Sequence, residues 1–438
     1  MRIIISSHNF YPTHSGGTEV YVYNLIKYLG NNHEILLIAA VNENDVNSYS
    51  IKPKTVFRDS AGFNSFIYKW DDINVMGIEV KYELTKNISK YSLDDKHSYK
   101  EALNKIGWQA PDQYWIHGFT AVSGLSLLFA LKENSPALII NAWMHTVFTC
   151  FKETWIKTLG NECNNAPDIS LCTNCIYTSY FYNSVIGSAS NKINNILFPI
   201  LPLKLNKRKH VDLHLNSLSI LVKYVNNWIC FTIDVKNQMV MMGIEDKSII
   251  YQRHGIDTSI FNTNGRKNSS FSNVRFLYTG RWLDIKGFYL LCKAWAELPQ
   301  DKSIRTLSIT GDLIGNETDY QISLIERLKN RDDVIWLGKL SQMELADKYK
   351  EHDVVLIPSL WYETGPMVYH EAIACGCNVI STNIGGCKEL AIIYKQYTFP
   401  PDHIIFSKEI KSFVPKKLEV FNMINHDNHF SKILSQLI

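Results

Sequence analysis

The interpretation of the whole chain depends on the stretch Trp361-Tyr362-Glu363-Thr364-Gly365-Pro366-Met367-Val368-Tyr369-His370-Glu371. Just before it, Val354 to Ile357 is a short, largely branched apolar run bounded by Pro358. Such a run is typical of a strand that is buried on both faces of a parallel sheet. The sequence therefore predicts an α/β fold in which this stretch leaves the carboxyl end of a buried strand.

A helix is expected directly after that strand. Pro366 suits the first helical turn, Thr364 can cap it, and Gly376 stands where a left-handed residue commonly ends a helix. Asn378 to Ser381 then reads as the next strand, and Gly385-Gly386 as the turn into a further helix. The alternation of strand and helix predicts a doubly wound domain.

Two carboxylates, Glu363 in the loop and Glu371 on the helix, are expected to face one crevice. Open parallel sheets bind ligands outside the carboxyl ends of their strands, where free amides at helix N-termini favour anions. Carboxylates repel phosphate but accept hydrogen bonds from sugar or ribose hydroxyls. Together these features indicate a ligand that contains both phosphate groups and sugar hydroxyls, such as a nucleotide sugar. Alone, two glutamates at this spacing also occur on many solvated helices.

Length and composition indicate an ordinary globular protein of two domains. The chain has 438 residues, 46% of them hydrophobic and 20% charged. Its net charge of +3 gives no reason to expect a nucleic-acid partner. The opening Met1 to Ile5 is too short for a signal sequence, and no apolar run approaches the length of a membrane span. With nine cysteines, an odd number, a reducing cytoplasm is the expected location.

The chain begins with a pattern of strand, glycine loop, helix and strand. Ile3 to Ser6 and His33 to Ala40 are the expected strands, with a helix over Thr18 to Leu29 between them. Gly16-Gly17 at the helix start would let backbone amides approach a diphosphate or an acceptor, or would only form a tight turn. Its spacing differs from Gly-x-Gly-x-x-Gly, which argues against a nicotinamide enzyme.

A strand over Val274 to Tyr278 leads to Gly280-Arg281 and Lys286-Gly287. Two cations around a strand-to-helix turn can grip a diphosphate, whose charge must be neutralised as it leaves. Leu307 to Gly311 and Val334 to Gly338 are further expected strands of the same domain.

These residues resemble the retaining glycosyltransferases of family 4, which have the GT-B fold: two facing doubly wound Rossmann-like domains with the active site in the cleft between them. Glu363 and Glu371 match the family's pair of glutamates, and Gly365-Pro366 stands in its usual place between them. Gly280-Arg281 with Lys286-Gly287 is similar to the family's diphosphate-binding segment. The segment His254-Gly255-Ile256-Asp257 resembles one in the family's crevice, except that His254 replaces the usual Asn.

The resemblance implies a role for each matching residue. Glu363 would bind hydroxyls of the donor sugar and Glu371 the ribose, while Arg281 and Lys286 would stabilise the leaving nucleoside diphosphate without a metal cofactor. The remaining donor-binding positions that it implies are Gly16, Gly17, Gly255, Gly311, Leu340, Gly365, Pro366, Met367 and Val368.

Two histidines fall just past expected strand ends, His117 after Tyr114 to Ile116 and His145 after Ala137 to Asn141. A lone histidine is usually a packed or surface residue, and this interpretation is preferred for His117. A functional role is preferred for His145, because the resembling family has a histidine near the transferring sugar at this point. A neutral imidazole can bind a sugar hydroxyl or take part in proton movement.

Two further segments leave alternatives open. Cys150, Cys163, Cys172 and Cys175 either form a structural zinc site or are unliganded buried thiols. Between Ile193 and His210, basic residues beside apolar ones either contact an anionic membrane surface or form a solvated face, which is preferred because prolines interrupt the segment.

The sequence thus predicts an acceptor domain over residues 1–212, a donor domain over 213–395 and a tail over 396–438 that can pack back towards the first domain. The predicted reaction moves a sugar from a nucleoside diphosphate sugar to a saccharide or lipid-linked saccharide, in surface polysaccharide or glycoconjugate synthesis. Two alternatives stay open: a nucleotide-sugar epimerase of the same fold, and a non-catalytic nucleotide-sugar-binding protein.

Overall fold

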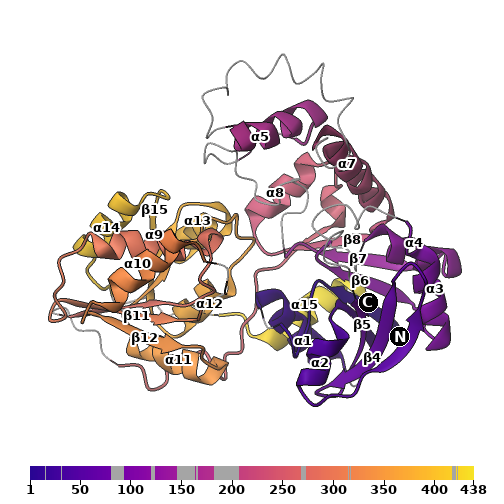
Figure 1. Cartoon of the computed structure of the whole chain (residues 1–438), viewed down its shortest axis with the longest axis horizontal. Coiled ribbons are helices and arrows are strands. Elements are labelled where there is room, and N and C mark those ends of the chain that lie inside the picture. Colours follow the sequence, from indigo (N-terminus) through magenta and orange to yellow (C-terminus); the bar gives the residue numbers. More distant parts are fainter. Residues whose placement is uncertain are drawn as a thin grey trace. The chain divides into compact units, whose positions relative to one another are not determined.

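A computed structural model describes residues 1–14, 16–30, 32–79, 93–119, 124–145, 163, 166–181, 207–267, 273–313, 315, 317–416, 421 and 423–438. The chain forms two compact units (Figure 1). The first contains Met1–Cys230, Lys236–Tyr251 and Ile433–Ile438, and the second Phe231–Val235 and Gln252–Lys432.

The first unit is built on a nine-stranded sheet of order β3-β4-β5-β2-β1-β6-β7-β8-β9, in which only the β3-β4 and β4-β5 pairs are antiparallel. Its strands are β1 (Arg2–Ser7), β2 (Glu34–Ala40), β3 (Lys54–Arg58), β4 (Asn64–Trp70), β5 (Ile73–Glu79), β6 (Gln113–His117), β7 (Ile139–Trp143), β8 (Asn227–Cys230) and β9 (Ile249–Tyr251). Its helices include α1 (Gly17–Leu29), α2 (Glu43–Ser48), α3 (Lys96–Lys105), α4 (Leu125–Asn134), α5 (Ile169–Phe181) and α7 (Lys207–Tyr224). The strand, loop, helix and strand predicted for the chain's start are confirmed by β1, α1 and β2.

The second unit is built on a six-stranded parallel sheet of order β12-β11-β10-β13-β14-β15. Its strands are β10 (Val274–Tyr278), β11 (Arg305–Thr310), β12 (Val334–Gly338), β13 (Val354–Ile357), β14 (Asn378–Thr382) and β15 (Tyr397–Phe399). Its helices are α9 (Phe288–Ala296), α10 (Asp319–Lys329), α11 (Gln342–Glu351), α12 (Met367–Ala374), α13 (Gly385–Ile393), α14 (His403–Ser412) and the start of α15 (His426–Leu437). Both units are therefore doubly wound and Rossmann-like, as predicted.

Strand β13 confirms the expectation of a strand buried on both faces. Val354 and Leu356 lie in one buried apolar cluster with residues of α9, α10 and α14. Val355 and Ile357 lie in a second cluster with residues of α11, α12 and α13. Because successive side chains of a strand point to opposite faces, helices cover both sides of this sheet.

The structure differs from the predicted domain limits. The strand expected at Ile229 to open the second domain is β8, which pairs with β7 of the first sheet, and β9 pairs with β8. Helix α8 (Ile233–Met241) follows, with its first residues in the second unit and the rest in the first. At the other end, β15 and α14 extend the second unit well beyond residue 395, and the last six residues belong to the first unit, where Gln113 Nε2 donates to Leu437 O over 3.3 Å.

The start of α12 also differs from the expected cap. The helix begins at Met367, and its N-cap residue is Pro366 and not Thr364. The reason is Gly365, whose φ of +135° turns the chain between Thr364 and the helix. The expected left-handed stop is confirmed, since Gly376 has φ +80°.

Gly287, between Lys286 and α9, is expected to tolerate no side chain. Its φ is +69°, and an added Cβ would collide with the carbonyl oxygen of Pro358 at the end of β13. Gly287→Ala should therefore lower the free energy of unfolding by about 3 kcal/mol, from left-handed strain plus overpacking. Gly265→Ala is the matched control, because Gly265 has φ +76° with nothing within 4 Å of the added Cβ. Equal thermal midpoints for the two variants would contradict this account of Gly287.

Candidate active site

The candidate site of the second unit lies where the direction of strand order reverses. From β10 the chain adds β11 and β12 on one side, and β13, β14 and β15 then extend the sheet on the other. Ligands of open α/β sheets bind at such a switch point, outside the carboxyl ends of the strands. Arg281 and Lys286 follow β10, and Glu363 follows β13, so these predicted residues come from the two strands that flank it.

The loop after β10 is held by buried aromatic side chains. Tyr278 Oη donates to Arg281 O over 3.0 Å, and Trp282 Nε1 donates to Thr310 O at the end of β11 over 3.0 Å. Gly311 lets this loop approach, because an added Cβ would lie 2.6 Å from Gly280 O. The backbone around Arg281 is thus fixed, while its side chain is exposed and makes no ion pair with any residue that the structure describes.

Lys286 and Glu363 form an ion pair at the centre of the site. Lys286 Nζ lies 2.7 Å from Glu363 Oε1, and Ser359 Oγ donates to the same oxygen over 2.7 Å. The Glu363 side chain is 12% exposed, so this carboxylate is nearly buried but still reachable. The loops after β10 and β13 are also joined through the backbone, where Leu360 N donates to Ile285 O over 2.9 Å.

Two glycines at the start of α13 determine where the backbone of Glu363 lies. Gly386 N donates to Glu363 O over 2.6 Å. A Cβ on Gly386 would lie 2.6 Å from that oxygen and 2.9 Å from Gly365 N, and one on Gly385 would meet the Tyr362 ring at 3.0 Å. The Gly-Gly turn predicted from the sequence is therefore needed for close contact between α13 and the loop that carries Glu363.

Glu371 lies on α12 and is 7% exposed. Tyr349 Oη of α11 donates to Glu371 Oε2 over 3.1 Å. Burial raises the pKa of the Glu371 carboxyl to about 7, although the hydrogen bond from Tyr349 acts in the opposite direction. A ligand hydroxyl that donates to Glu371 would stabilise its ionised form.

The other predicted donor-binding residues fall at the carboxyl edge of the sheet or on the loops beside it. Gly365, Pro366, Met367 and Val368 lead into α12, Gly311 follows β11, and Leu340 follows β12. His254 stacks on Phe231 with ring centroids 3.7 Å apart, and Gly365 packs against both. Gly255 packs instead against α15, where an added Cβ would lie 2.6 Å from His429 Cβ. None of these contacts assigns a ligand, so the donor-binding roles stay predictions.

In the first unit, the structure brings His145 together with His117. His117 Nδ1 and His145 Nε2 are 2.9 Å apart, because β6 and β7 pair with His117 opposite Trp143. At the switch point between β1 and β6, Gly16 precedes α1, and its N–H donates to Glu19 Oε2 over 2.8 Å. Gly17 is the first residue of α1. The amide of Gly16 thus already has an anionic partner within its own helix.

The predicted metal and membrane segments lie partly outside the described residues. Cys150 and the segment 193–206 fall outside them, while Cys172 and Cys175 lie one turn apart on α5. Among described residues, no group of three or more His, Cys, Asp or Glu could hold a metal ion. None of the described helices is long and apolar enough to cross a membrane. The zinc site therefore stays a prediction.

Ser359 and Tyr349 contact the two predicted glutamates but had no signal in the sequence. Serine and tyrosine are common, and each reaches its glutamate only through the packing of the second unit.

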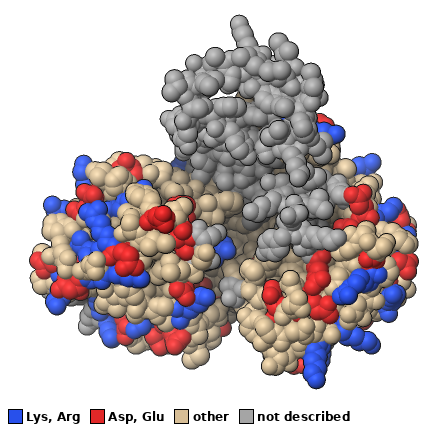
Figure 2. Space-filling view, in the orientation of Figure 1, with Lys and Arg blue, Asp and Glu red and all other residues tan. Residues whose placement is uncertain are grey.

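Over the visible face of the second unit, basic residues (Lys and Arg) are interspersed with acidic ones (Asp and Glu) (Figure 2).

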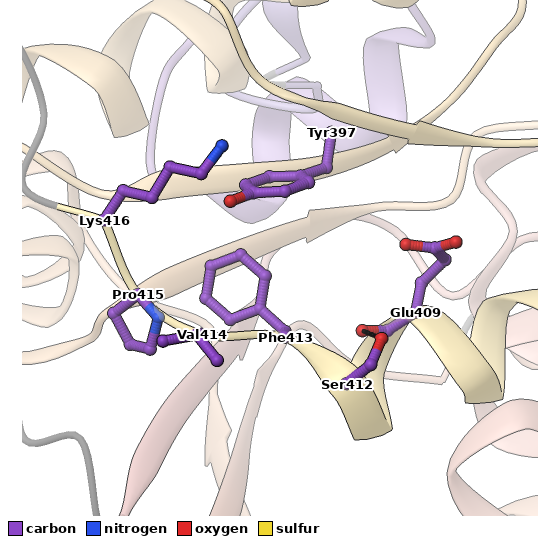
Figure 3. Close-up of a pocket in the computed structure, with 7 residues that line it drawn as sticks. All are labelled: Tyr397, Glu409, Ser412, Phe413, Val414, Pro415 and Lys416. Carbon is purple, nitrogen blue, oxygen red and sulfur yellow. Dashed lines mark hydrogen bonds between the residues drawn. The ribbon is translucent and has the colours of Figure 1, made fainter.

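A separate pocket of about 310 Å³ lies at the opposite edge of the second sheet (Figure 3). It is lined by Tyr397, Glu409, Ser412, Phe413, Val414, Pro415 and Lys416. Lys416 O accepts from Asn378, the first residue of β14, so the pocket adjoins the amino end of that strand. The pocket is thus no part of the candidate site.

Comparisons with known proteins agree with this geometry. Residues 264–426 match the family described as "Glycosyl transferases group 1". A D-inositol 3-phosphate glycosyltransferase of Pseudarthrobacter chlorophenolicus is 35% identical over 134 residues, 30% of this chain and 31% of the relative. The lipopolysaccharide 1,2-N-acetylglucosaminetransferase of Salmonella typhimurium is 31% identical over 121 residues, 26% of this chain and 32% of the relative. The alignments thus span about a third of the length of these curated relatives.

Among solved structures, Anabaena HepE in complex with UDP and glucose superposes with a TM-score of 0.60 at 13% identity, covering 99% of this chain and 98% of that one. This likeness shows the GT-B fold. The region that matches the glycosyltransferase group 1 family, residues 264–426, contains Arg281, Lys286, Glu363 and Glu371.

Proposed function

We propose that the chain is a retaining glycosyltransferase of family 4, which transfers a sugar from a nucleoside diphosphate sugar to an acceptor hydroxyl. The observation that carries this proposal is the pair of Lys286 and Glu363, 2.7 Å apart at the switch point of the second sheet. A cation and a nearly buried carboxylate at this distance can contact the phosphate and the sugar of one ligand. The match of residues 264–426 supports the same assignment.

In this proposal, the basic residues bind the diphosphate and the acidic residues bind hydroxyl groups of the donor. Lys286 and Arg281 neutralise the diphosphate as the bond between the anomeric carbon and the phosphate oxygen breaks. Glu363 accepts hydrogen bonds from sugar hydroxyls, and Glu371 accepts them from the ribose. The new bond joins the anomeric carbon to the acceptor oxygen, and the acceptor's proton passes to the leaving phosphate, so atoms and charge balance.

A UDP-sugar is the first donor to test, because HepE has been crystallised with UDP-glucose. The acceptor that we propose is a saccharide or lipid-linked saccharide used in a surface polysaccharide or glycoconjugate, since one of the relatives above is named a lipopolysaccharide 1,2-N-acetylglucosaminetransferase. Neither the relatives nor the structure named above is a nucleotide-sugar epimerase, so none of them supports that alternative.

Binding and turnover of nucleotides test the proposal directly. Ligand that binds only the folded state raises the thermal midpoint, so a panel of nucleoside diphosphates and their sugars should identify one stabilising base. Release of the diphosphate from the corresponding sugar donor should then be measured with and without saccharide acceptors. Well-folded protein that neither binds nor cleaves any of these donors would overturn the proposal.

Replacement of Arg281 with alanine is expected to lower kcat about a hundredfold with little change in the thermal midpoint. The guanidinium is exposed and makes no ion pair among the described residues, so the fold loses little. The loss of kcat reflects removal of one group that stabilises the leaving diphosphate. Arg327→Ala, on the exposed face of α10, is the control and should keep wild-type kcat. Wild-type turnover by Arg281→Ala would exclude this role.

A further inference from the structure

The pair of His117 and His145 in the first unit has a protonation pattern that the geometry determines. His117 is the last residue of β6 and is fully buried, and its ring stacks on Trp143 with centroids 4.4 Å apart. Tyr21 of α1 packs edge-on against His145 at 4.9 Å, and its Oη accepts a hydrogen bond from Trp143 Nε1 over 3.2 Å. Aromatic rings from α1 and β7 therefore hold both imidazoles in place.

His117 carries only one proton in this environment. Burial lowers its pKa well below the usual range, and the charge of a protonated His145 would lower it further. Its Nε2 is buried and has no hydrogen-bond partner among the residues that the structure describes. A buried N–H without an acceptor is costly, so the single proton of His117 belongs on Nδ1. Nδ1 is the atom that lies 2.9 Å from His145 Nε2.

We propose that His117 is a positioning residue, whose Nδ1–H donates to His145 Nε2 and thereby leaves the proton of His145 on Nδ1. An imidazole whose Nε2 accepts a hydrogen bond is neutral and has one N–H, here on Nδ1. His145 is then a hydrogen-bond donor to an oxygen of the bound sugar or diphosphate, and it does not accept the proton of the acceptor hydroxyl. This inference rests on the proposed glycosyltransferase function only for the identity of that oxygen.

Two variants of His117 separate the hydrogen bond from the packing. His117→Phe keeps an aromatic ring against Trp143 but removes the donor. His117→Asn has a smaller side chain, but its amide nitrogen can replace Nδ1–H as the donor to His145. Nitrogen-15 NMR of histidine-labelled full-length protein distinguishes a protonated ring nitrogen from a bare one, and the signals of His145 are assigned from their loss in His145→Gln.

In the wild type and in His117→Asn, we expect a protonated Nδ1 and a bare Nε2 on His145. In His117→Phe, the two tautomers of His145 should mix, and kcat should fall about tenfold with little change in the donor KM, as for one lost hydrogen bond. His117→Asn should recover most of that kcat, which packing alone would not predict. A protonated Nε2 on His145 in the wild type, or an unchanged tautomer in His117→Phe, would overturn the inference. If the wild type transfers no sugar, the proposed function fails, and the NMR spectra still decide the state of the pair.

Discussion

Replacing Lys286 with alanine is expected to lower kcat for sugar transfer about a thousandfold, within the range measured for loss of a preorganised electrostatic group. Lys286 Nζ lies 2.7 Å from Glu363 Oε1, and its side chain is 31% exposed, so the ammonium can reach both this carboxylate and a ligand phosphate. Under the proposed function, the variant loses the cation that neutralises the leaving diphosphate, and it leaves Glu363 with one partner fewer. Steady-state kinetics at saturating donor measure the loss.

Lys302→Ala is the matched control for Lys286→Ala. Lys302 is 67% exposed and lies 3.5 Å from Asp332, and exposed pairs of this kind contribute little. Its kcat should equal that of the wild type. Glu363→Gln and the double variant complete a cycle, in which the double variant should lose less than the sum of the two single losses if both side chains act on one step. Additive losses, or wild-type kcat in Lys286→Ala, would refute the paired role.

The second unit was predictable from sequence because its signals are local. The run Val354 to Ile357, the helix stop at Gly376 and the Gly385-Gly386 turn each depend on neighbouring residues only, and each lies in the structure where it was expected. The N-cap position predicted at Thr364 was wrong although the residue type was suitable, because Gly365 turns the chain with a φ of +135° and Pro366 takes that position.

Membership of a sheet depends on pairing between distant segments, which a local pattern cannot reveal. Asn227–Cys230 was expected in the second domain, yet Asn227 pairs with Asn141 of β7. Contacts within the candidate sites also join distant segments, so a local sequence pattern could not reveal them. Lys286 and Glu363 were each predicted, but their contact joins residues 77 positions apart. His117 was taken for a packing residue, and only the register of β6 on β7 places it against His145.

Glu371→Gln is expected to stabilise the fold at neutral to alkaline pH and to weaken nucleotide binding at the same time. Burial raises the folded-state pKa of Glu371 from an ordinary 4.5 to about 7. Between these pH values the unfolded chain is ionised while the folded carboxyl is protonated, so the wild type loses stability as pH rises through this window. Glutamine does not ionise, and its side-chain oxygen can still accept the hydrogen bond from Tyr349.

The advantage of Glu371→Gln over the wild type should therefore be small near pH 4.5 and approach about 3 kcal/mol above pH 8. Thermal midpoints across that range measure it, with Glu326→Gln as the control because Glu326 is 56% exposed on α10. UDP is expected to bind the wild type more tightly as pH rises through about 7, because under the proposed function ribose hydroxyls donate to the ionised carboxylate. Glu371→Gln should bind UDP about 10- to 100-fold more weakly at pH 8, with no such rise. Parallel midpoints for the variant and the wild type at every pH would contradict the buried, protonated carboxyl, and unchanged UDP affinity would remove Glu371 from the donor site.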